Sequence, residues 1–209
     1  MSFESRLKAQ ALGLGFDLAG ITTLGPAETH AAFTAWLAAG HHGEMDYLRR
    51  GAELRADTTR PEPGMVSAVV VALDYGGKQP DGPVARYARG ADYHRVMWDR
   101  LDELLAWVRH ERGSEVHGRA YVDTGPILER DLARRAGLGW FGKNTMLIHP
   151  ALGSFFFLGA LFLDCALEPD APFADEHCGT CTRCLDACPT EAFVAPQVLD
   201  ARRCISYLT

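Results

Sequence analysis

Two patterns of apolar residues alternate along the first three-quarters of the chain. Between residues 92 and 110, apolar side chains recur every three or four positions, which is the spacing of one face of an amphipathic helix that ends at Gly113. Residues 65–73 are instead an almost unbroken apolar run, typical of a strand buried on both faces. The alternation of these patterns predicts a mixed α/β (α+β) domain.

The same patterns predict further elements and one domain boundary. Helices are expected over residues 3–14, 26–39, 43–50 and 126–137, and strands over 16–22, 115–123, 140–149 and 154–164, the last two as a hairpin around a turn at 151–153. Residues 167–175 are polar and contain two prolines, which is typical of a linker. We therefore expect one domain over residues 1–166 and a smaller one over residues 167–209.

Composition and charge narrow the functional classes. With 47% hydrophobic and 23% charged residues, the chain is typical of a soluble globular protein, and its net charge of −6 provides no overall attraction for nucleic acid. The longest apolar stretch, residues 155–163, is too short to span a bilayer, and the first eight residues lack the pattern of a signal peptide. We expect a cytoplasmic protein without a membrane anchor, in a compartment that keeps thiols reduced.

Four cysteines near the C-terminus carry the clearest chemistry. Two, two and three residues separate Cys178, Cys181, Cys184 and Cys188, and Pro189 follows directly, as in the ligand run of bacterial ferredoxins. The first three thiolates of such a run bind one iron–sulfur cluster, and the fourth binds a neighbouring cluster. A zinc site or a redox-active Cys-x-x-Cys pair is the alternative, although zinc sites usually use two separated cysteine pairs.

Two more cysteines lie outside this run. Cys204 follows Cys188 by sixteen residues and is a candidate ligand of the second cluster, whereas Cys165 ends an apolar strand and is expected to be structural. Two four-iron clusters need eight ligands, and the sequence supplies three for one cluster and two for the other. We therefore expect a fragment of a longer protein, whose ferredoxin-like domain is incomplete at its C-terminus.

Polar, glycine-rich segments interrupt the apolar strands at residues 87–94, 123–126 and 139–145. Asp123 is the most informative of their residues, because it follows an apolar strand at a strand-to-helix turn, where α/β folds place catalytic groups. Burial would raise its pKa and make it a proton donor. From the residues alone, capping of the helix after Pro126 explains Asp123 at least as well.

Several longer motifs resemble one known family, the epoxyqueuosine reductases, over nearly the whole chain. The motifs are RGADYH (89–94), VDTGPILER (122–130), RAGLGWFGKNT (135–145), GSFFFLG (153–159), the cysteine run, and LDARRCISYLT (199–209). The resemblance implies a cobalamin-binding domain like that of reductive dehalogenases, followed by a ferredoxin-like domain with two 4Fe-4S clusters. It also implies reduction of epoxyqueuosine to queuosine at the wobble position of tRNA, with electrons passing from the clusters to cobalamin.

The resemblance also assigns roles to individual residues. Asp123 matches the family's acid, which protonates the oxygen that leaves the substrate. Positions that line cobalamin match Arg55, Tyr93, His94, Asn144, Leu147, His149 and Ser206. The implied partners are a tRNA bearing epoxyqueuosine and an external electron donor, and the enzyme is expected to be a monomer.

Some features depart from the family's pattern or leave it open. Family members continue beyond Thr209 with a second cysteine run and usually a helical-repeat region that helps to hold tRNA. Arg130, Arg134 and Arg135 either contact tRNA phosphate or form a solvated helix face. Two other functions are compatible with the sequence: a corrinoid reductive dehalogenase acting on a small organohalide, and a ferredoxin-type electron carrier without enzymatic activity.

Overall fold

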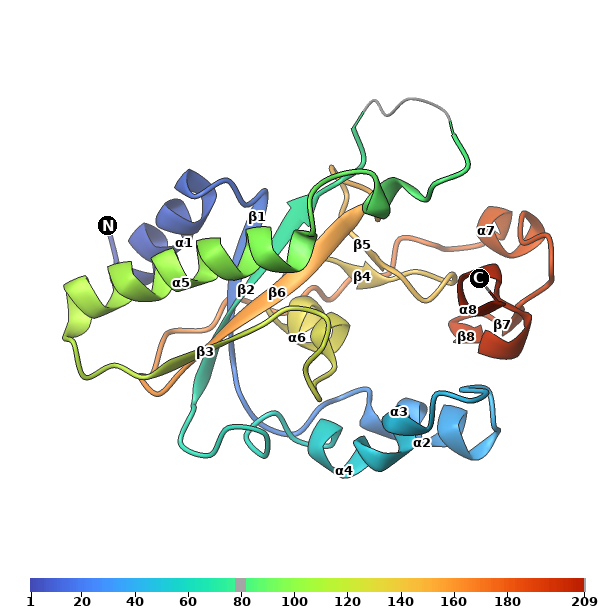
Figure 1. Ribbon diagram of the computed structural model, residues 1–209, viewed down its shortest axis with the longest axis horizontal. Coiled ribbons are helices and arrows are strands. Elements are labelled where there is room, and N and C mark those ends of the chain that lie inside the picture. Colours follow the sequence, from blue (N-terminus) through green and yellow to red (C-terminus); the bar gives the residue numbers. More distant parts are fainter. Residues whose placement is uncertain (78–81, 209) are drawn as a thin grey trace.

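A four-stranded sheet forms the centre of the computed structural model, which describes residues 1–77 and 82–208 (Figure 1). Across the sheet the strands are β1 (Leu18–Thr23), β2 (Ser67–Asp74), β6 (Phe156–Leu163) and β3 (Gly118–Tyr121). Every neighbouring pair is antiparallel, with Val70 opposite Ala160 and Ala120 opposite Leu161. The predicted mixed α/β architecture is confirmed, and its sheet is antiparallel.

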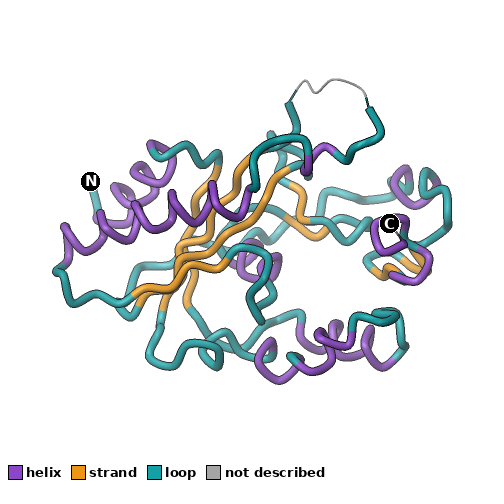
Figure 2. The backbone as a smooth tube through the Cα atoms, viewed as in Figure 1, coloured by secondary structure: helices purple, strands orange, loops and turns teal. Residues whose placement is uncertain are grey.

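Helices cover both faces of this sheet (Figure 2). They are α1 (Phe3–Gly13), α5 (Tyr93–Arg112) and α6 (Glu129–Arg135). Val69 and Leu161 pack with α1 and α5 on one face, whereas Val70 and Phe162 pack with α6 on the other. Successive strand residues point to opposite faces, so the continuous apolar run of β2 is buried on both sides, as predicted.

Residues 140–164 differ from the predicted hairpin. β4 (Trp140–Phe141) pairs with β5 (Leu147–Ile148) in a separate two-stranded ribbon, and β6 pairs instead with β2 and β3. Between the ribbon and β6, His149 and Gly153 form an isolated bridge. A place in the middle of the sheet buries both faces of β6, which removes more apolar surface from water than a local hairpin would.

Two smaller parts lie beside the sheet. The arm, residues 30–55, contains α2 (His30–Ala38), α3 (Asp46–Arg50) and α4 (Ala52–Arg55), none of which has a buried residue. The cysteine unit, residues 177–208, contains α7 (Arg183–Asp186), β7 (Phe193–Ala195), β8 (Val198–Leu199), η2 (Ala201–Arg203) and α8 (Ile205–Leu208). A further short helix, η1 (Arg86–Ala88), precedes α5.

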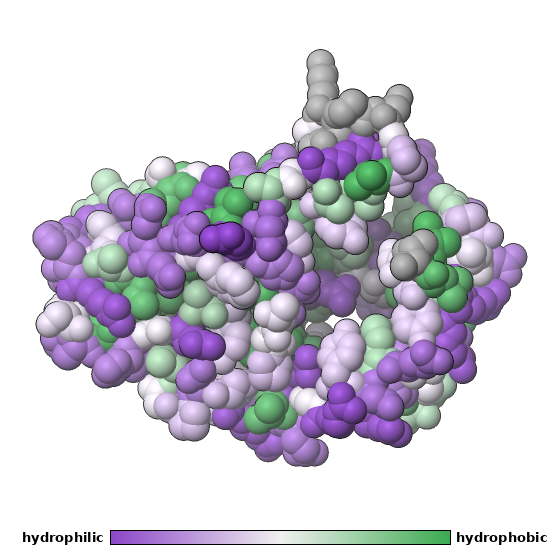
Figure 3. Space-filling model, in the orientation of Figure 1, coloured by the Kyte–Doolittle hydropathy of each residue, from purple (hydrophilic) through white to green (hydrophobic). Residues whose placement is uncertain are grey.

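Hydrogen bonds tie the cysteine unit to the arm and to the β4–β5 ribbon. The indole N–H of Trp36 donates to the carbonyl of Leu199 at 2.6 Å. From the other side, Lys143 Nζ donates to the carbonyl oxygens of Gly179 and Cys181, at 2.7 and 3.0 Å. The four-stranded sheet with α1, α5 and α6 is called the sheet domain below. The sheet domain, the arm and the cysteine unit surround a hollow in the molecular surface, seen to the right of centre in Figure 3.

The predicted linker is fixed along the edge of the sheet. The backbone N–H of Asp170 donates to the carbonyl of Ile21 at 2.9 Å, and the Asp170 carboxylate accepts from the Ile21 N–H at 2.9 Å and from Lys8 Nζ. These residues therefore satisfy backbone groups of β1 that no strand pairs. None of the described helices is both long and apolar enough to cross a membrane.

Candidate functional site

Asp123 lies on the loop that follows β3. Its backbone has φ = +58°, a left-handed conformation that Asp and Asn tolerate better than other non-glycine residues. Thr124 N–H donates to the carbonyl of Val122 at 2.6 Å and tightens the turn. The Asp123 side chain is 66% exposed and begins no helix, because α6 starts at Glu129. The helix-cap interpretation is therefore wrong.

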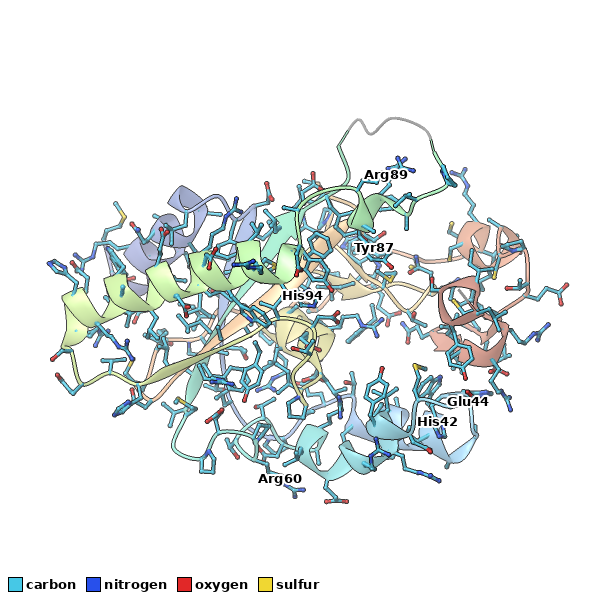
Figure 4. The ribbon with its side chains drawn as sticks, viewed as in Figure 1. His42, Glu44, Arg60, Tyr87, Arg89 and His94 are labelled. Atoms are coloured by element: carbon cyan, nitrogen blue, oxygen red, sulfur yellow. The ribbon has the colours of Figure 1, made fainter. Side chains whose placement is uncertain are left out.

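Two side chains at the start of α5 meet Asp123. Tyr93 Oη donates to Asp123 Oδ2 at 2.6 Å, and His94 Nε2 lies 3.8 Å from the same oxygen. Asp92 caps α5 by accepting from the His94 N–H at 3.0 Å, and its Oδ1 also lies 2.9 Å from His94 Nδ1. Figure 4 shows His94 at the end of α5 that borders the hollow. The cap thus orients the imidazole towards Asp123.

Burial and the neighbouring Asp123 carboxylate raise the pKa of Tyr93, which therefore stays protonated and remains a donor. His94 Nε2 is buried and has no hydrogen-bond partner among the described residues. Such an atom is usually satisfied by water or a ligand. Tyr93 therefore donates its hydrogen bond to Asp123, whereas His94 presents a ring nitrogen that can bind water or a ligand.

A row of aromatic rings fixes the position of Tyr93. Its ring stacks on Phe157 of β6, with centroids 3.9 Å apart and an interplanar angle of 4°. The row continues to Tyr75 and Phe155 on one side and to His94 and Trp98 on the other. This stacking anchors the end of α5 to the middle of the sheet.

Glu129 is a neighbouring residue that sequence reasoning missed. It is the first residue of α6, and its Oε1 is buried without a hydrogen-bond partner among the described residues. Burial raises the pKa of Glu129 to about 7; a hydrogen bond from its own backbone opposes this shift, the Asp123 charge adds to it, and Arg130 and Arg55 oppose it. Its place in VDTGPILER was visible, but nothing in that pattern distinguishes a Glu with one buried oxygen from a solvated residue of a first helical turn.

The other residues matched to cobalamin positions are spread over several elements. Arg55 ends α4, Asn144 lies in the β4–β5 turn, and Ser206 is exposed on α8. The Leu147 side chain is buried in the core together with residues of α6. His149 lines a cavity of about 350 Å³ together with Lys8 and Asp170, and burial lowers its pKa.

The cysteine unit holds five of the six cysteines, none of which forms a disulfide. A turn closes between Cys178 and Cys181, whose N–H donates to the Cys178 carbonyl at 2.9 Å. The Ala192 N–H donates to Cys188 Sγ at 3.3 Å, and this bond, with others from the following backbone, lowers the pKa of that thiol. Within residues 1–77 and 82–208, no three His, Cys, Asp or Glu side chains converge closely enough to hold a metal ion. Cys165 packs against the core, as expected.

The arginines around α6 serve mainly internal contacts. Arg135 is 9% exposed, pairs with Asp131 at 3.5 Å and donates to the carbonyl of Thr23. Arg134 pairs with Glu28, and Arg130 donates to the carbonyl of Thr145. The prediction that all three arginines share one outward face is therefore wrong.

Comparison with known proteins places this geometry in a family. The family model "Epoxyqueuosine reductase QueG, DUF1730" matches residues 55–124, which include the Asp123 loop and the start of α5. An epoxyqueuosine reductase of Cyclobacterium marinum is 42% identical over 97% of this chain and 67% of its own length. The chain belongs to the epoxyqueuosine reductase family. The model "4Fe-4S double cluster binding domain" matches residues 177–209, which nearly coincide with the cysteine unit.

Other family members define how much of the molecule is present. An epoxyqueuosine reductase of Xanthomonas campestris is 45% identical over 98% of this chain and 60% of its own length, so the chain spans about 60% of that relative. A crystal structure of an epoxyqueuosine reductase with an epoxyqueuosine-modified tRNA-Tyr stem loop superposes with a TM-score of 0.87 and 33% identity, over 98% of this chain and 56% of that one. In a solved structure of the epoxyqueuosine reductase from Bacillus subtilis, which is 31% identical with a TM-score of 0.85 over 98% of this chain and 56% of that one, a catalytic aspartate loop is swung out of the active site.

A more distant likeness concerns the fold alone. A reductive dehalogenase structure matches with a TM-score of 0.52 and 24% identity, over 81% of this chain and 20% of that one. The predicted dehalogenase-like architecture is thereby confirmed.

Proposed function

We propose that this protein reduces epoxyqueuosine to queuosine at the wobble position of tRNA. The observation that carries the proposal is the Tyr93–Asp123 hydrogen bond beside the hollow, in a chain of this family. A relative binds a tRNA stem loop that carries the epoxide, which supports the same class of substrate here. A cytoplasmic, monomeric enzyme that receives electrons from an external donor fits this reaction.

The proposed cofactors are two 4Fe-4S clusters and cobalamin. Cys178, Cys181 and Cys184 would hold one cluster, and Cys188 and Cys204 would ligate the other; the double-cluster family model and the all-thiol donor set support this assignment.

The residues that match the family's cobalamin-lining positions would hold cobalamin. They are Arg55, Tyr93, His94, Asn144, Leu147, His149 and Ser206. The unpartnered His94 Nε2 and the hollow itself fit a large, partly polar ligand. When bound, cobalamin would supply reducing electrons at the epoxide carbon. The proposed division into a catalytic domain (1–166) and an iron–sulfur domain (167–209) gives each cofactor its own structural support.

Asp123 is the proposed proton donor. Tyr93 binds Oδ2, so Oδ1 is the oxygen that is left to carry a proton to the leaving oxygen of the epoxide. Because the aromatic row fixes Tyr93, the hydrogen bond also sets the direction of the carboxyl. The exposed position of the Asp123 side chain keeps it within reach of a bound substrate.

Asp123→Asn tests this role in the protein expressed from its complete reading frame. Asn tolerates the left-handed backbone and keeps the shape of the side chain but cannot give up a proton. We expect turnover on epoxyqueuosine-containing tRNA to fall about 10²–10⁴-fold, while visible absorption shows that cobalamin and clusters are retained. Asp99→Asn, on an exposed part of α5, is the matched control.

Four outcomes would contradict the proposal. Undiminished turnover would remove Asp123 from the chemistry, and loss of cobalamin from the variant would make it a binding residue. If the wild-type protein retained no cobalamin after reconstitution, the electron-carrier alternative would be favoured. Dehalogenation of an organohalide without action on tRNA would favour the other enzymatic alternative.

A further inference from the structure

We propose that His94 stores the second proton of each turnover and passes it to Asp123. The inference rests on the proposed function, since it concerns the supply of protons to that reaction. It would make His94 a residue that acts through Asp123, without contact to the substrate, in an array that Asp92 completes.

The stoichiometry of the reaction requires a second proton. Removing the oxygen of an epoxide as water breaks two C–O bonds, forms one C=C bond, and consumes two electrons and two protons. The electrons come from the external donor through the proposed clusters. The first proton converts the oxygen to a hydroxyl group when the first C–O bond breaks, and the second lets that group leave as water. Asp123 carries one proton and becomes a carboxylate by giving it up, so it must be reprotonated before the second bond breaks.

The imidazole of His94 lies between two carboxyl groups. Its Nδ1 is at hydrogen-bond distance from Asp92 Oδ1, at 2.9 Å, and its Nε2 is 3.8 Å from Asp123 Oδ2. The second distance exceeds that of a hydrogen bond by less than about 1 Å. Hydrogen bonds between catalytic groups are often long before the substrate binds and shorten in the complex. A small movement of either side chain therefore lets a proton on Nε2 pass to the Asp123 carboxylate.

Asp92 determines which ring nitrogen exchanges that proton. Hydrogen bonds from the side chain and the backbone of His94 lower the pKa of Asp92, which is therefore ionised at neutral pH. A carboxylate only accepts hydrogen bonds, so His94 Nδ1 keeps its hydrogen. Nε2 is left as the nitrogen that gains and loses a proton, as in the Asp–His pairs of serine proteases.

The surroundings of Nε2 favour this role. The atom is buried and has no hydrogen-bond partner in the part of the chain that the structure describes. A buried polar atom without a partner is unfavourable for stability, so its presence calls for a functional explanation. The ring is held between Tyr93 and Trp98, with centroids 4.1 and 5.7 Å away, which keeps Nε2 close to Asp123.

The transfer of the stored proton balances in bonds and charge. The Nε2–H bond of the imidazolium breaks and an O–H bond forms on Asp123, which then protonates the hydroxyl group that leaves as water. The leaving oxygen is far more basic than a carboxylate or an imidazole, so it draws the proton through Asp123. The ring ends neutral, with its hydrogen on Nδ1. After the product has left, the Asp123 side chain, which is 66% exposed, takes up protons from solvent and returns one to His94.

His94→Gln tests the proposal, because Gln keeps a polar side chain of similar length but cannot release a proton. In the protein from the complete reading frame, we expect kcat to fall at least about 10-fold, with unchanged KM and with cobalamin and clusters retained. His110→Gln is the matched control, since His110 lies on the same helix beside Glu111 and is 83% exposed. Full activity of His94→Gln would overturn the proposal, and so would loss of cobalamin, which would make His94 a binding residue instead.

The pH dependence separates proton storage from a structural role. The titratable groups that the described part of the chain places against the ring are Asp92 and Tyr93 from the start of α5 and Asp123 from the loop after β3. Because the imidazolium is the proton source, wild-type kcat should decline as pH rises through the titration of His94, and this decline should vanish in His94→Gln. Added imidazole derivatives should restore part of the turnover of His94→Ala, with a pH profile that follows the pKa of the derivative. A restored rate whose pH profile ignores the derivative would contradict proton storage.

A second measurement does not depend on turnover. NMR of protein with isotope-labelled histidine should show the hydrogen of neutral His94 on Nδ1. Asp92→Asn removes a charge 2.9 Å from the ring and keeps a residue suited to cap α5, so the ring should titrate at lower pH in this variant, and the decline of kcat should move with it. A hydrogen on Nε2 in the neutral wild-type ring, or a kinetic midpoint that does not follow the NMR midpoint, would overturn the proposal.

The two proposals fail distinguishably. If Asp123→Asn is inactive while His94→Gln keeps full activity and the wild-type pH profile, the storage role is wrong and the proposed function stands. If the wild type does not reduce the epoxide, the proposed function fails and the storage role fails with it, while the NMR titration still shows whether Asp92 sets the protonation of His94.

Discussion

The sheet domain and the cysteine unit are stabilised by different interactions. In the sheet domain, long strands are buried on both faces: Val69, Val70 and Leu161 are at most 1% exposed. In the described residues 178–208, the buried side chains are Ala192, Asp200 and Ala201. The unit instead carries hydrogen bonds to its neighbours, such as those of Trp36 and Lys143, and a dense set of thiols.

This contrast separates two sources of stability. Burial of apolar surface contributes about 25 cal/mol per Å² and is the main stabilising interaction of the sheet. A segment of about thirty residues buries too little surface to fold alone and usually depends on metal ligation or on contacts with a larger domain. The sheet domain should therefore respond most to changes of volume, and the cysteine unit to changes of charge, hydrogen bonding and ligation.

The largest effect is expected in the core of the sheet. Leu161→Ala removes a fully buried side chain from the middle strand β6 and leaves a cavity between the sheet and α5, which should lower the free energy of unfolding by about 3 kcal/mol. Urea denaturation followed by circular dichroism measures the change. Leu12→Ala, at a position that is 48% exposed, should change it by less than about 0.5 kcal/mol. Equal effects of both variants would contradict the assignment of the core.

A smaller loss of stability is expected at low pH, where Asp200 in the cysteine unit becomes protonated. Hydrogen bonds from the Arg202 side chain and backbone, with the nearby His41, lower the pKa of Asp200 to about 2 from 3.8. The folded-state pKa is the lower one, so the stabilisation is present above about pH 4 and is lost as pH falls towards 2. Solvent near this small unit reduces the contribution to about 1 kcal/mol.

Measuring the free energy of unfolding of Asp200→Asn and of the wild type between pH 2 and pH 5 checks this expectation. The variant should lose the part of the pH dependence between about pH 4 and pH 2 that the wild type shows. Asp175→Asn, in the exposed segment before the cysteine run, should keep it. An unchanged profile in Asp200→Asn would show that Arg202 and His41 do not stabilise the carboxylate in solution.

The smallest effect is expected at the contact between the ribbon and the cysteine run. Lys143→Met removes the hydrogen bonds to the carbonyls of Gly179 and Cys181, which lie at the surface and together contribute about 0.5–1 kcal/mol. Amide hydrogen exchange of residues 178–181 should become about 3-fold faster, with no change in the sheet. Arg183→Met, on the exposed side of α7, should leave the exchange rates as they are.

Local patterns predicted most of the fold. The apolar stripe of α5 and the apolar run of β2 predicted the type of each element and its boundaries to within a few residues. Burial on one face of a helix, or on both faces of a strand, produces a recognisable spacing of apolar residues in the sequence. The pairing of β6 was missed, since its partners β2 and β3 are distant in sequence and periodicity carries no information about partners. The sequence predicted a linker at residues 167–175 but not its contact with β1. That contact depends on Asp170, whose carboxylate accepts a hydrogen bond from the N–H of Ile21, a residue distant in sequence.

The site was also partly predictable, because some of its residues lie in local sequence motifs and others depend on tertiary packing. Asp123, Tyr93 and His94 lie in motifs that the family resemblance singled out, and the structure brings them together. Glu129 was missed because the burial of its Oε1 depends on the tertiary packing around the start of α6, which no sequence window reports. Arg135 was misassigned because its partner, Asp131, is one turn away on the same helix, a spacing also found on solvated helix faces.

Tyr93 and Asp123 differ in how firmly the molecule holds them. Tyr93 stacks between the rings of Phe157 and His94, and its helix packs on the sheet. Asp123 instead lies on a loop, and one hydrogen bond joins its side chain to Tyr93. A hydrogen bond to a charged group contributes about 1.5–3 kcal/mol, which corresponds to a ratio of formed to broken bonds of roughly 10 to 150. This bond would thus be broken in roughly 1–10% of molecules at any moment, a fraction large enough for the Asp123 side chain to move aside for a bulky substrate without a dedicated opening step.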